Sequence, residues 1–208
     1  MKPIFSRNED YTKIAFLNWR IDKWSDILNM LNIADGFMRS AIELSKFALN
    51  NNDDKAADIL IFPILTNANH GIELYLKALT WMLNKKMEED MRIEGAHNIR
   101  QIYATVRSKI KKYGGEITIK HFDEETEGLN NYIEELFEKT QATARQDKMD
   151  FSRYPFDNKY ENHFYVDQIG NVEIDLENFE ERFSAIHQSL EQLSDFLYHI
   201  ELNRDHYE

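Results

Sequence analysis

Apolar residues recur at helical spacing along most of the chain. They fall every three or four residues, the interval that places them on one face of a helix. The predicted helices span residues 25–49, about 54–84, the segment between Gly95 and Gly114, 123–145 and 176–200. Ser25 and Asp175 are suitable N-caps. Pro63 is expected to kink or restart the second helix.

The spacing changes in the segment between Arg153 and Asp175. Residues 160–166 and 172–174 are β-prone, and the intervening Gln-Ile-Gly-Asn at 168–171 suits a hairpin turn. This pattern predicts a short β-hairpin before the C-terminal helix. The apolar residues at 14–19 fit either a strand or a helix, and both interpretations stay open.

Together these elements predict a mainly α protein, an antiparallel helical bundle with one inserted β-hairpin. A chain of 208 residues suits a single domain with a substantial core. We therefore expect one domain over 1–208, with its core at about 25–202 and an N-terminal extension at 1–24.

Composition bears on the cellular location of the protein. The chain has no cysteine, its N-terminus lacks the apolar stretch of a signal peptide, and no apolar run reaches the ~20 residues of a membrane span. A cytoplasmic protein without membrane contact is expected.

The net charge of −12 argues against a broad electrostatic grip on nucleic acid. A local basic patch is still conceivable near the end of the third helix. Its members are Arg100, Arg107, Lys109, Lys111 and Lys112. The simpler interpretation is a solvated helix face with cations near its C-terminus.

Three segments place ionisable groups beside apolar residues. His70, Glu73 and Lys77 share one face of the second helix, and His97 and Arg153 could meet that face across the bundle. One interpretation is a structural network in which Glu73 accepts hydrogen bonds from Arg153 and His97. The other is a ligand pocket for a phosphate or nucleotide, with Arg153 as a bidentate ligand.

These segments occur in a recognisable order: HGIELYLKAL at 70–79, GAHNI at 95–99, FSRYPFD at 151–157 and EIDL at 173–176. In this order the chain resembles the HEPN-like helical bundles of prokaryotic defence and toxin–antitoxin loci. The resemblance covers roughly residues 25–202. It implies a helical bundle that commonly dimerises and, in several members, a metal-independent ribonuclease.

Such ribonucleases carry an Arg and, after four to six intervening residues, a His on a late helix. The His moves protons and the Arg stabilises the scissile phosphate. Two stretches match this spacing, residues 92–97 and residues 182–187. Arg182 and His187 lie on the last helix, as the motif requires, but Phe183 replaces its usual polar neighbour. They point more than about 90° apart, so they could converge only with a second subunit.

The resemblance and the residues support two hypotheses. The first is an HEPN-like effector or accessory module that binds or cleaves RNA. The second is a non-catalytic helical interaction or dimerisation module whose polar network is structural. For the first, the candidate catalytic residues are Arg182, His187, His97 and Arg153, and the candidate ligand-binding residues are His70, Glu73 and Lys77.

Metal and cofactor motifs are weak. A carboxylate-bridged site needs Glu-x-x-His on two helices, and Glu94 with His97 gives one such pair in a predicted loop. His187 and Glu191 stand four residues apart, but two ligands alone define no metal site. We expect neither a metal nor a cofactor.

The last helix also suggests a protein partner. Its apolar and aromatic residues cover about half of its circumference, more than one bundle groove normally buries. They are Phe179, Phe183, Ile186, Leu190, Leu193, Phe196, Leu197 and Ile200. This edge predicts a homodimer or a heteromer with a neighbouring defence protein.

Overall fold

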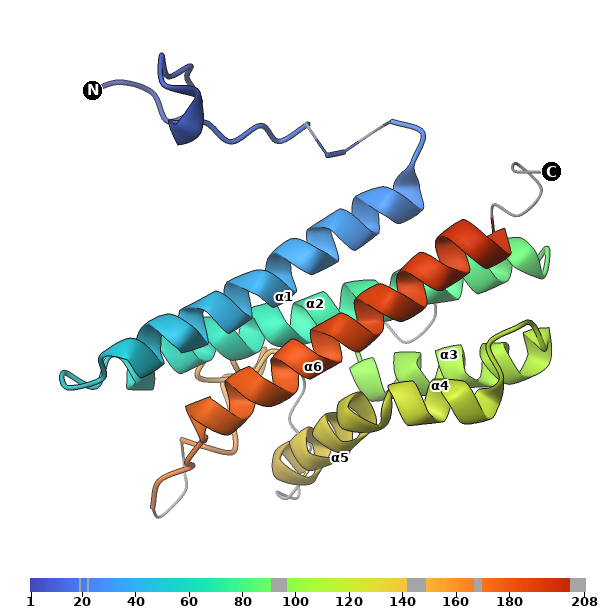
Figure 1. The fold of residues 1–208 in the computed structure, drawn as a ribbon. Coiled ribbons are helices and arrows are strands. Elements are labelled where there is room, and N and C mark those ends of the chain that lie inside the picture. Colours follow the sequence, from blue (N-terminus) through green and yellow to red (C-terminus); the bar gives the residue numbers. More distant parts are fainter. Residues whose placement is uncertain (19, 22, 91–96, 142–148, 167–169, 203–208) are drawn as a thin grey trace.

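The computed structural model is a mainly helical bundle (Figure 1) and describes residues 1–18, 20–21, 23–90, 97–141, 149–166 and 170–202. Its α-helices are α1 (Asp26–Asn50), α2 (Ala57–Lys86), α3 (Ile99–Tyr113), α4 (Ile119–Glu125), α5 (Glu127–Gln141) and α6 (Leu176–Asp195). A 3-10 turn, η1 (Tyr11–Lys13), precedes them, and α6 continues into a π-helical segment, η2 (Phe196–Leu202).

The two longest helices, α1 and α2, form an antiparallel hairpin, and α6 packs against both (Figure 1). On the other side of α2 lies α3, and α4 and α5 lie against α3. α5 also packs against α6. The bundle therefore has α2 in its centre, which explains why α2 buries more residues than any other described helix.

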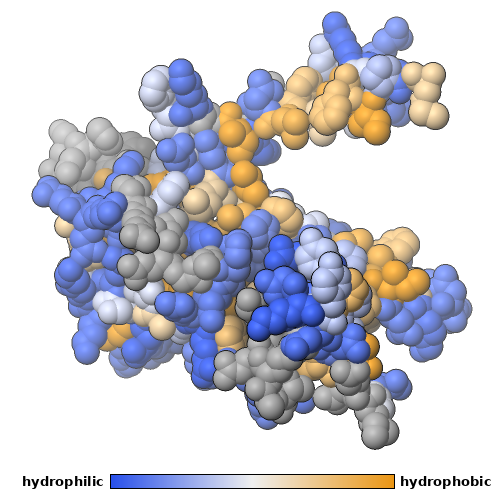
Figure 2. All heavy atoms as spheres, turned by 180° about the vertical axis from the view of Figure 1, so that it is seen from behind, coloured by the Kyte–Doolittle hydropathy of each residue, from blue (hydrophilic) through white to orange (hydrophobic). Residues whose placement is uncertain are grey.

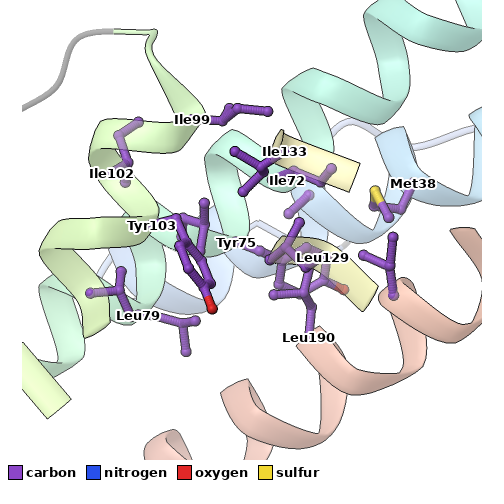
Figure 3. Packing of buried hydrophobic residues seen from close by; sticks show 14 of the residues in the cluster. Met38, Ile72, Tyr75, Leu79, Ile99, Ile102, Tyr103, Leu129, Ile133 and Leu190 are labelled. Atoms are coloured by element: carbon purple, nitrogen blue, oxygen red, sulfur yellow. The ribbon is translucent and has the colours of Figure 1, made fainter. Parts of the chain in front are cut away.

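One apolar cluster joins all these α-helices (Figure 3). Ile72, Tyr75 and Leu79 of α2 lie among Met38 of α1, Leu190 of α6 and residues of α3 and α5. Most of the apolar residues predicted to share helix faces lie in this core, whereas Leu49, Ile59 and Ile200 are exposed.

The predicted helix ends are largely confirmed by their caps. The Asp175 side chain accepts hydrogen bonds from the backbone N–H groups of Glu177 and Asn178, so it caps α6. Asn98 caps α3 in the same way, and Gly114 ends α3 with φ of 63°, a left-handed conformation that favours glycine. Ser25 precedes α1 without a side-chain capping bond.

Pro63 does not restart the second helix, because α2 runs continuously from Ala57 through it. Pro63 lacks an N–H and leaves the carbonyl of Ile59 without its usual helical partner. Both residues are exposed, so water can satisfy that carbonyl.

The predicted fourth helix is two helices, α4 and α5, separated at Thr126. The buried Thr126 hydroxyl donates to the carbonyl of Phe122 and lies 2.9 Å from the hydroxyl of Tyr103 on α3. A side chain that bonds to its own helix backbone bends the helix. The predicted end of this helix, beyond residue 141, lies outside the described residues.

The predicted hairpin is not supported. Within 149–166 and 170–175 no strand forms, and the only bridge is an isolated antiparallel pair between Phe156 and Asn162. Instead of alternating, Phe164 and Tyr165 both pack against the helical core. Two residues of the predicted turn, 168 and 169, lie outside the described part of the chain.

The N-terminal extension forms neither the strand nor the helix considered for 14–19 in its described residues, and η1 is its one helical element there. The extension stands apart from the helical body and carries hydrophobic residues such as Ile4, Phe5 and Leu17 in exposed positions (Figure 2). Among the described helices, none combines the length and apolar character needed to cross a membrane.

Candidate functional site

The three polar segments meet at a pocket of about 240 Å³ beside the middle of α2. It is lined by Phe37, Thr66, Asn69, His70, Glu73, His97, Ile99, Met149 and Arg153. The helical spacing of α2 puts Thr66, Asn69, His70 and Glu73 along one side of the pocket. The start of α3 and the segment at 149–153 supply the opposite side.

Glu73 is the centre of the polar contacts in this pocket, although it is buried. Its Oε1 accepts a hydrogen bond from Lys77 Nζ at 2.6 Å and lies 3.0 Å from His97 Nδ1. Its Oε2 lies 3.6 Å from His70 Nδ1, a longer contact. One carboxylate therefore joins two imidazoles and an ammonium group.

These contacts set the protonation of Glu73. Burial alone raises its pKa, but the contacts with His70 and Lys77 and the positive charges of Lys77 and His97 outweigh burial and lower the pKa to about 2. Glu73 is therefore a carboxylate at neutral pH. A fixed negative charge at this point favours His97 with its hydrogen on Nδ1, which leaves Nε2 as the basic nitrogen.

His97 and Arg153 are accessible to a ligand. The His97 side chain is 67% exposed even though Nδ1 contacts the buried Glu73. Arg153 is also exposed and lines the pocket, and its guanidinium forms no ion pair with any residue in the described ranges. The expected hydrogen bond from Arg153 to Glu73 is not formed, because Lys77 and His97 take that position.

Asn69 adds a donor that the sequence analysis did not single out. Its Oδ1 accepts from the Tyr132 hydroxyl at 2.7 Å, and its buried Nδ2 has no partner among the described residues. A buried N–H group without an acceptor is costly. In this pocket, an acceptor oxygen from a ligand would satisfy it. The only signal in the sequence is the position of Asn69 directly before His70.

Phe37 of α1 closes another side of the pocket. Its ring meets the His70 imidazole edge-on, with centroids 4.5 Å apart. This contact fixes the plane of His70 beside Glu73. The pocket thus offers donors and imidazoles around one buried carboxylate, with an aromatic wall.

The side chains of Arg182 and His187 on α6 do not meet within one chain. Arg182 Nη1 forms an ion pair with Glu135 of α5 at 2.8 Å, whereas His187 Nε2 lies 3.0 Å from Asp35 of α1. The two side chains thus contact different helices. The other match, at residues 92–97, has five residues, including Arg92, outside the described part of the chain, as is Glu94 of the possible metal pair.

The basic patch on α3 is largely paired with carboxylates. Arg107 Nη2 lies 2.6 Å from Asp123, Arg100 contacts Glu134, and Lys109 and Lys112 both contact Glu89. These acidic partners offset the positive charge at the surface. The arrangement fits the solvated helix face better than a nucleic-acid surface.

The apolar edge of the last helix is mostly consumed within the chain. Phe179, Phe183, Ile186, Leu190, Leu193 and Leu197 are buried. Phe196 packs partly against the core, which leaves Ile200 as the exposed member of the predicted edge. α1, α2 and α5 together bury this wide stripe, so the stripe no longer argues for a partner at α6.

Comparisons of the chain with protein-family models, with curated proteins and with solved structures found no match.

Proposed function

We propose that this chain is an HEPN-like module that binds RNA at the pocket beside α2 and cleaves it without a metal. The observation that carries this proposal is the contact between Glu73 and His97 Nδ1 at 3.0 Å, beside an accessible Arg153 in the same pocket. In phosphodiester transfer, an imidazole oriented by a carboxylate can act as the base and a guanidinium can stabilise the charge on the phosphate.

Each group has a defined part in this chemistry. His97 Nε2 removes the proton from a ribose 2′-hydroxyl, whose oxygen attacks phosphorus and forms a 2′,3′-cyclic phosphate. The bond between phosphorus and the 5′-oxygen breaks, and His70 in its protonated form donates a proton to that oxygen. Arg153 stabilises the negative charge on the phosphate oxygens.

Glu73 and Lys77 support this site without contacting the reacting atoms. Glu73 holds His97 in the required tautomer and stabilises the imidazolium that forms. Lys77 Nζ balances the buried charge of Glu73. Local positive groups are essential, because the chain as a whole carries a net charge of −12 and repels RNA.

The setting follows from the resemblance to HEPN-like modules. We place the chain in the cytoplasm of a prokaryote, as an effector or accessory protein of a defence or toxin–antitoxin system. Its partner is a second copy of the chain or a neighbouring defence protein. Arg182 and His187 contribute to cleavage in this scheme only if their present ion pairs are exchanged in the assembly.

Cleavage of a 5′-labelled RNA in the presence of a chelator tests the proposal. His97→Ala and Arg153→Ala should each slow cleavage by about 100-fold or more. The expected product carries a 2′,3′-cyclic phosphate. Two exposed residues outside the pocket provide matched controls, so His121→Ala and Arg20→Ala should cleave like the parent.

The buried position of Glu73 favours a second candidate, a non-catalytic interaction module in which the same contacts only stabilise the fold. In that case the parent protein leaves the RNA intact, and His97→Ala lowers the melting temperature without any effect on RNA. Loss of cleavage with an unchanged melting temperature would instead support the catalytic role.

A further inference from the structure

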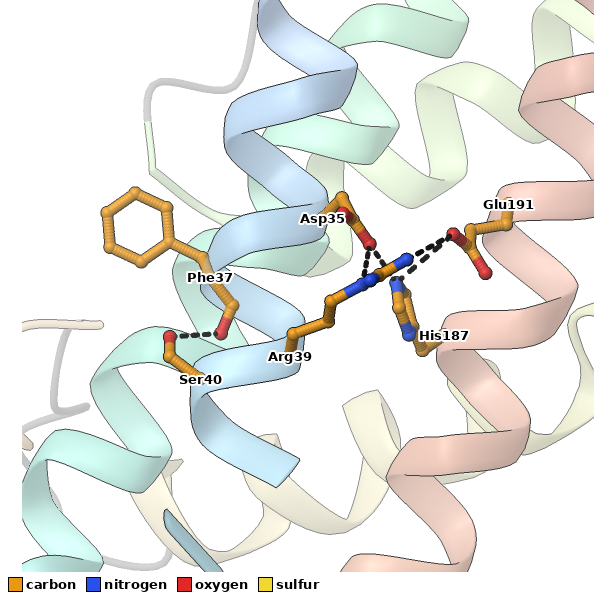
Figure 4. Close-up of polar contacts among 6 residues, drawn as sticks. All are labelled: Asp35, Phe37, Arg39, Ser40, His187 and Glu191. Atoms are coloured by element: carbon orange, nitrogen blue, oxygen red, sulfur yellow. Dashed lines mark hydrogen bonds and ion pairs between the residues drawn. The ribbon is translucent and has the colours of Figure 1, made fainter. Parts of the chain in front are cut away.

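A second cluster of polar side chains lies between α1 and α6, away from the pocket (Figure 4). Asp35 of α1 and His187 and Glu191 of α6 each offer one possible ligand atom, and these three atoms lie within 4.8 Å of one another. His187 is buried, whereas the two carboxylates are half-exposed.

The distances suit a small divalent cation. His187 Nε2 lies 3.0 Å from Asp35 Oδ1 and 3.8 Å from Glu191 Oε1. Ligand atoms bound to Zn²⁺ at about 2.0–2.2 Å in a tetrahedral site lie about 3.3–3.6 Å apart, between these two distances. His187 and Glu191 are one helical turn apart on α6, so they reach the same point from one face.

The positively charged side chain of Arg39 already contacts both carboxylates of this cluster. Arg39 Nε lies 2.7 Å from Asp35 Oδ1, and Arg39 Nη2 lies 3.7 Å from Glu191 Oε1 (Figure 4). The Arg39 side chain is nevertheless 65% exposed, so it can turn into solvent at little cost. Arg39 bridges the same two carboxylates that a metal ion would bridge.

We propose that Asp35, His187 and Glu191 form a Zn²⁺ site that joins α1 to α6 and displaces Arg39 from the two carboxylates. One imidazole and two carboxylates suit zinc, and water would complete the coordination. This site lies apart from the pocket beside α2, where His97, His70 and Arg153 carry the proposed RNA cleavage without a metal.

Titration of the metal-stripped full-length chain with Zn²⁺ in a calorimeter tests this site. One equivalent should bind, and Zn²⁺ should raise the melting temperature, because the metal binds the folded state. His187→Ala and Glu191→Gln should each weaken binding at least about tenfold. The Glu191 side chain is 40% exposed, so Glu191→Gln should fold like the parent. This variant therefore tests the site even if His187→Ala, which removes a buried side chain, fails to fold.

Arg39→Gln distinguishes a metal site from an ion-pair network. The substitution removes the competing guanidinium and should tighten Zn²⁺ binding by a measurable factor. If the cluster is only a network of ion pairs, the substitution lowers the melting temperature and leaves Zn²⁺ binding absent. His121→Ala, at an exposed histidine away from the cluster, is the matched control and should bind Zn²⁺ like the parent. No Zn²⁺ binding, binding unchanged by Glu191→Gln, or weaker binding by Arg39→Gln would each overturn the proposal.

Discussion

At the scale of single residues, Glu73 connects stability and the proposed chemistry. Its pKa is lowered to about 2 from an ordinary value of 4.5. A carboxyl group with a lowered pKa in the folded state stabilises that state fully above the ordinary value, and this contribution is lost as the pH falls from 4.5 towards 2. The acid sensitivity of the fold should therefore depend on Glu73.

The test is Glu73→Gln, which removes the charge that Lys77 needs. We expect the free energy of unfolding at pH 7 to fall by about 2–3 kcal/mol, because Lys77 is largely buried. Between pH 4.5 and 2 the parent should lose more stability than the variant. Denaturant unfolding followed by circular dichroism at several pH values measures both. Glu43→Gln, at an exposed ion pair, is the control, and parallel curves for parent and Glu73→Gln would contradict the prediction.

At the scale of elements, the contact between α1 and α2 depends on one glycine. A Cβ atom at Gly71 would lie 2.6 Å from Met38 Cγ and 3.1 Å from the Met38 backbone nitrogen. The methionine side chain can move, but its backbone nitrogen is fixed in α1. The two helices can thus approach closely at this position only without a side chain.

Gly71→Ala should therefore destabilise the protein by about 1–3 kcal/mol through overpacking. Gly36→Ala is the matched control, since Gly36 also lies within a helix and a Cβ there meets nothing within 4 Å. That control should stabilise the protein by up to about 1 kcal/mol, the usual helical difference between the two residues. If both substitutions change the melting temperature equally, the close contact between Gly71 and Met38 does not restrict the side chain at position 71.

At the scale of the whole molecule, we expect self-association through α1, which carries exposed apolar residues. Ile33 and Phe47 are 45% and 66% exposed and lie two heptads apart on α1. Ser40 lies midway between them, so two antiparallel copies would place Ile33 opposite Phe47. This is the geometry of a two-fold interface.

We expect the protein to form a dimer in light scattering at tens of micromolar and Phe47→Glu to yield a monomer of 24.8 kDa. Phe196→Glu, on the edge that the sequence analysis favoured, should instead lower the melting temperature, because Phe196 packs against the core. A monomeric parent protein, or a dimer that survives Phe47→Glu, would exclude association through α1.

The sequence by itself determined the helices and several of their ends. Hydrophobic spacing is a local property, and it correctly predicted α1, α2, α3 and α6. The stop at Gly114 and the cap at Asp175 are local too, since each acts on neighbouring backbone groups. The hairpin failed because a β-prone segment needs a partner strand, and Phe164 and Tyr165 found the helical core instead.

Only the tertiary structure decided which faces meet. Spacing placed His70, Glu73 and Lys77 on one side of a helix, but it could not choose Lys77 and His97 over Arg153 as the partners of Glu73. Asp35 and His187 lie 152 residues apart in sequence, and no local pattern connects them. Helical spacing tells which residues share a face, whereas packing of the whole chain determines what that face contacts.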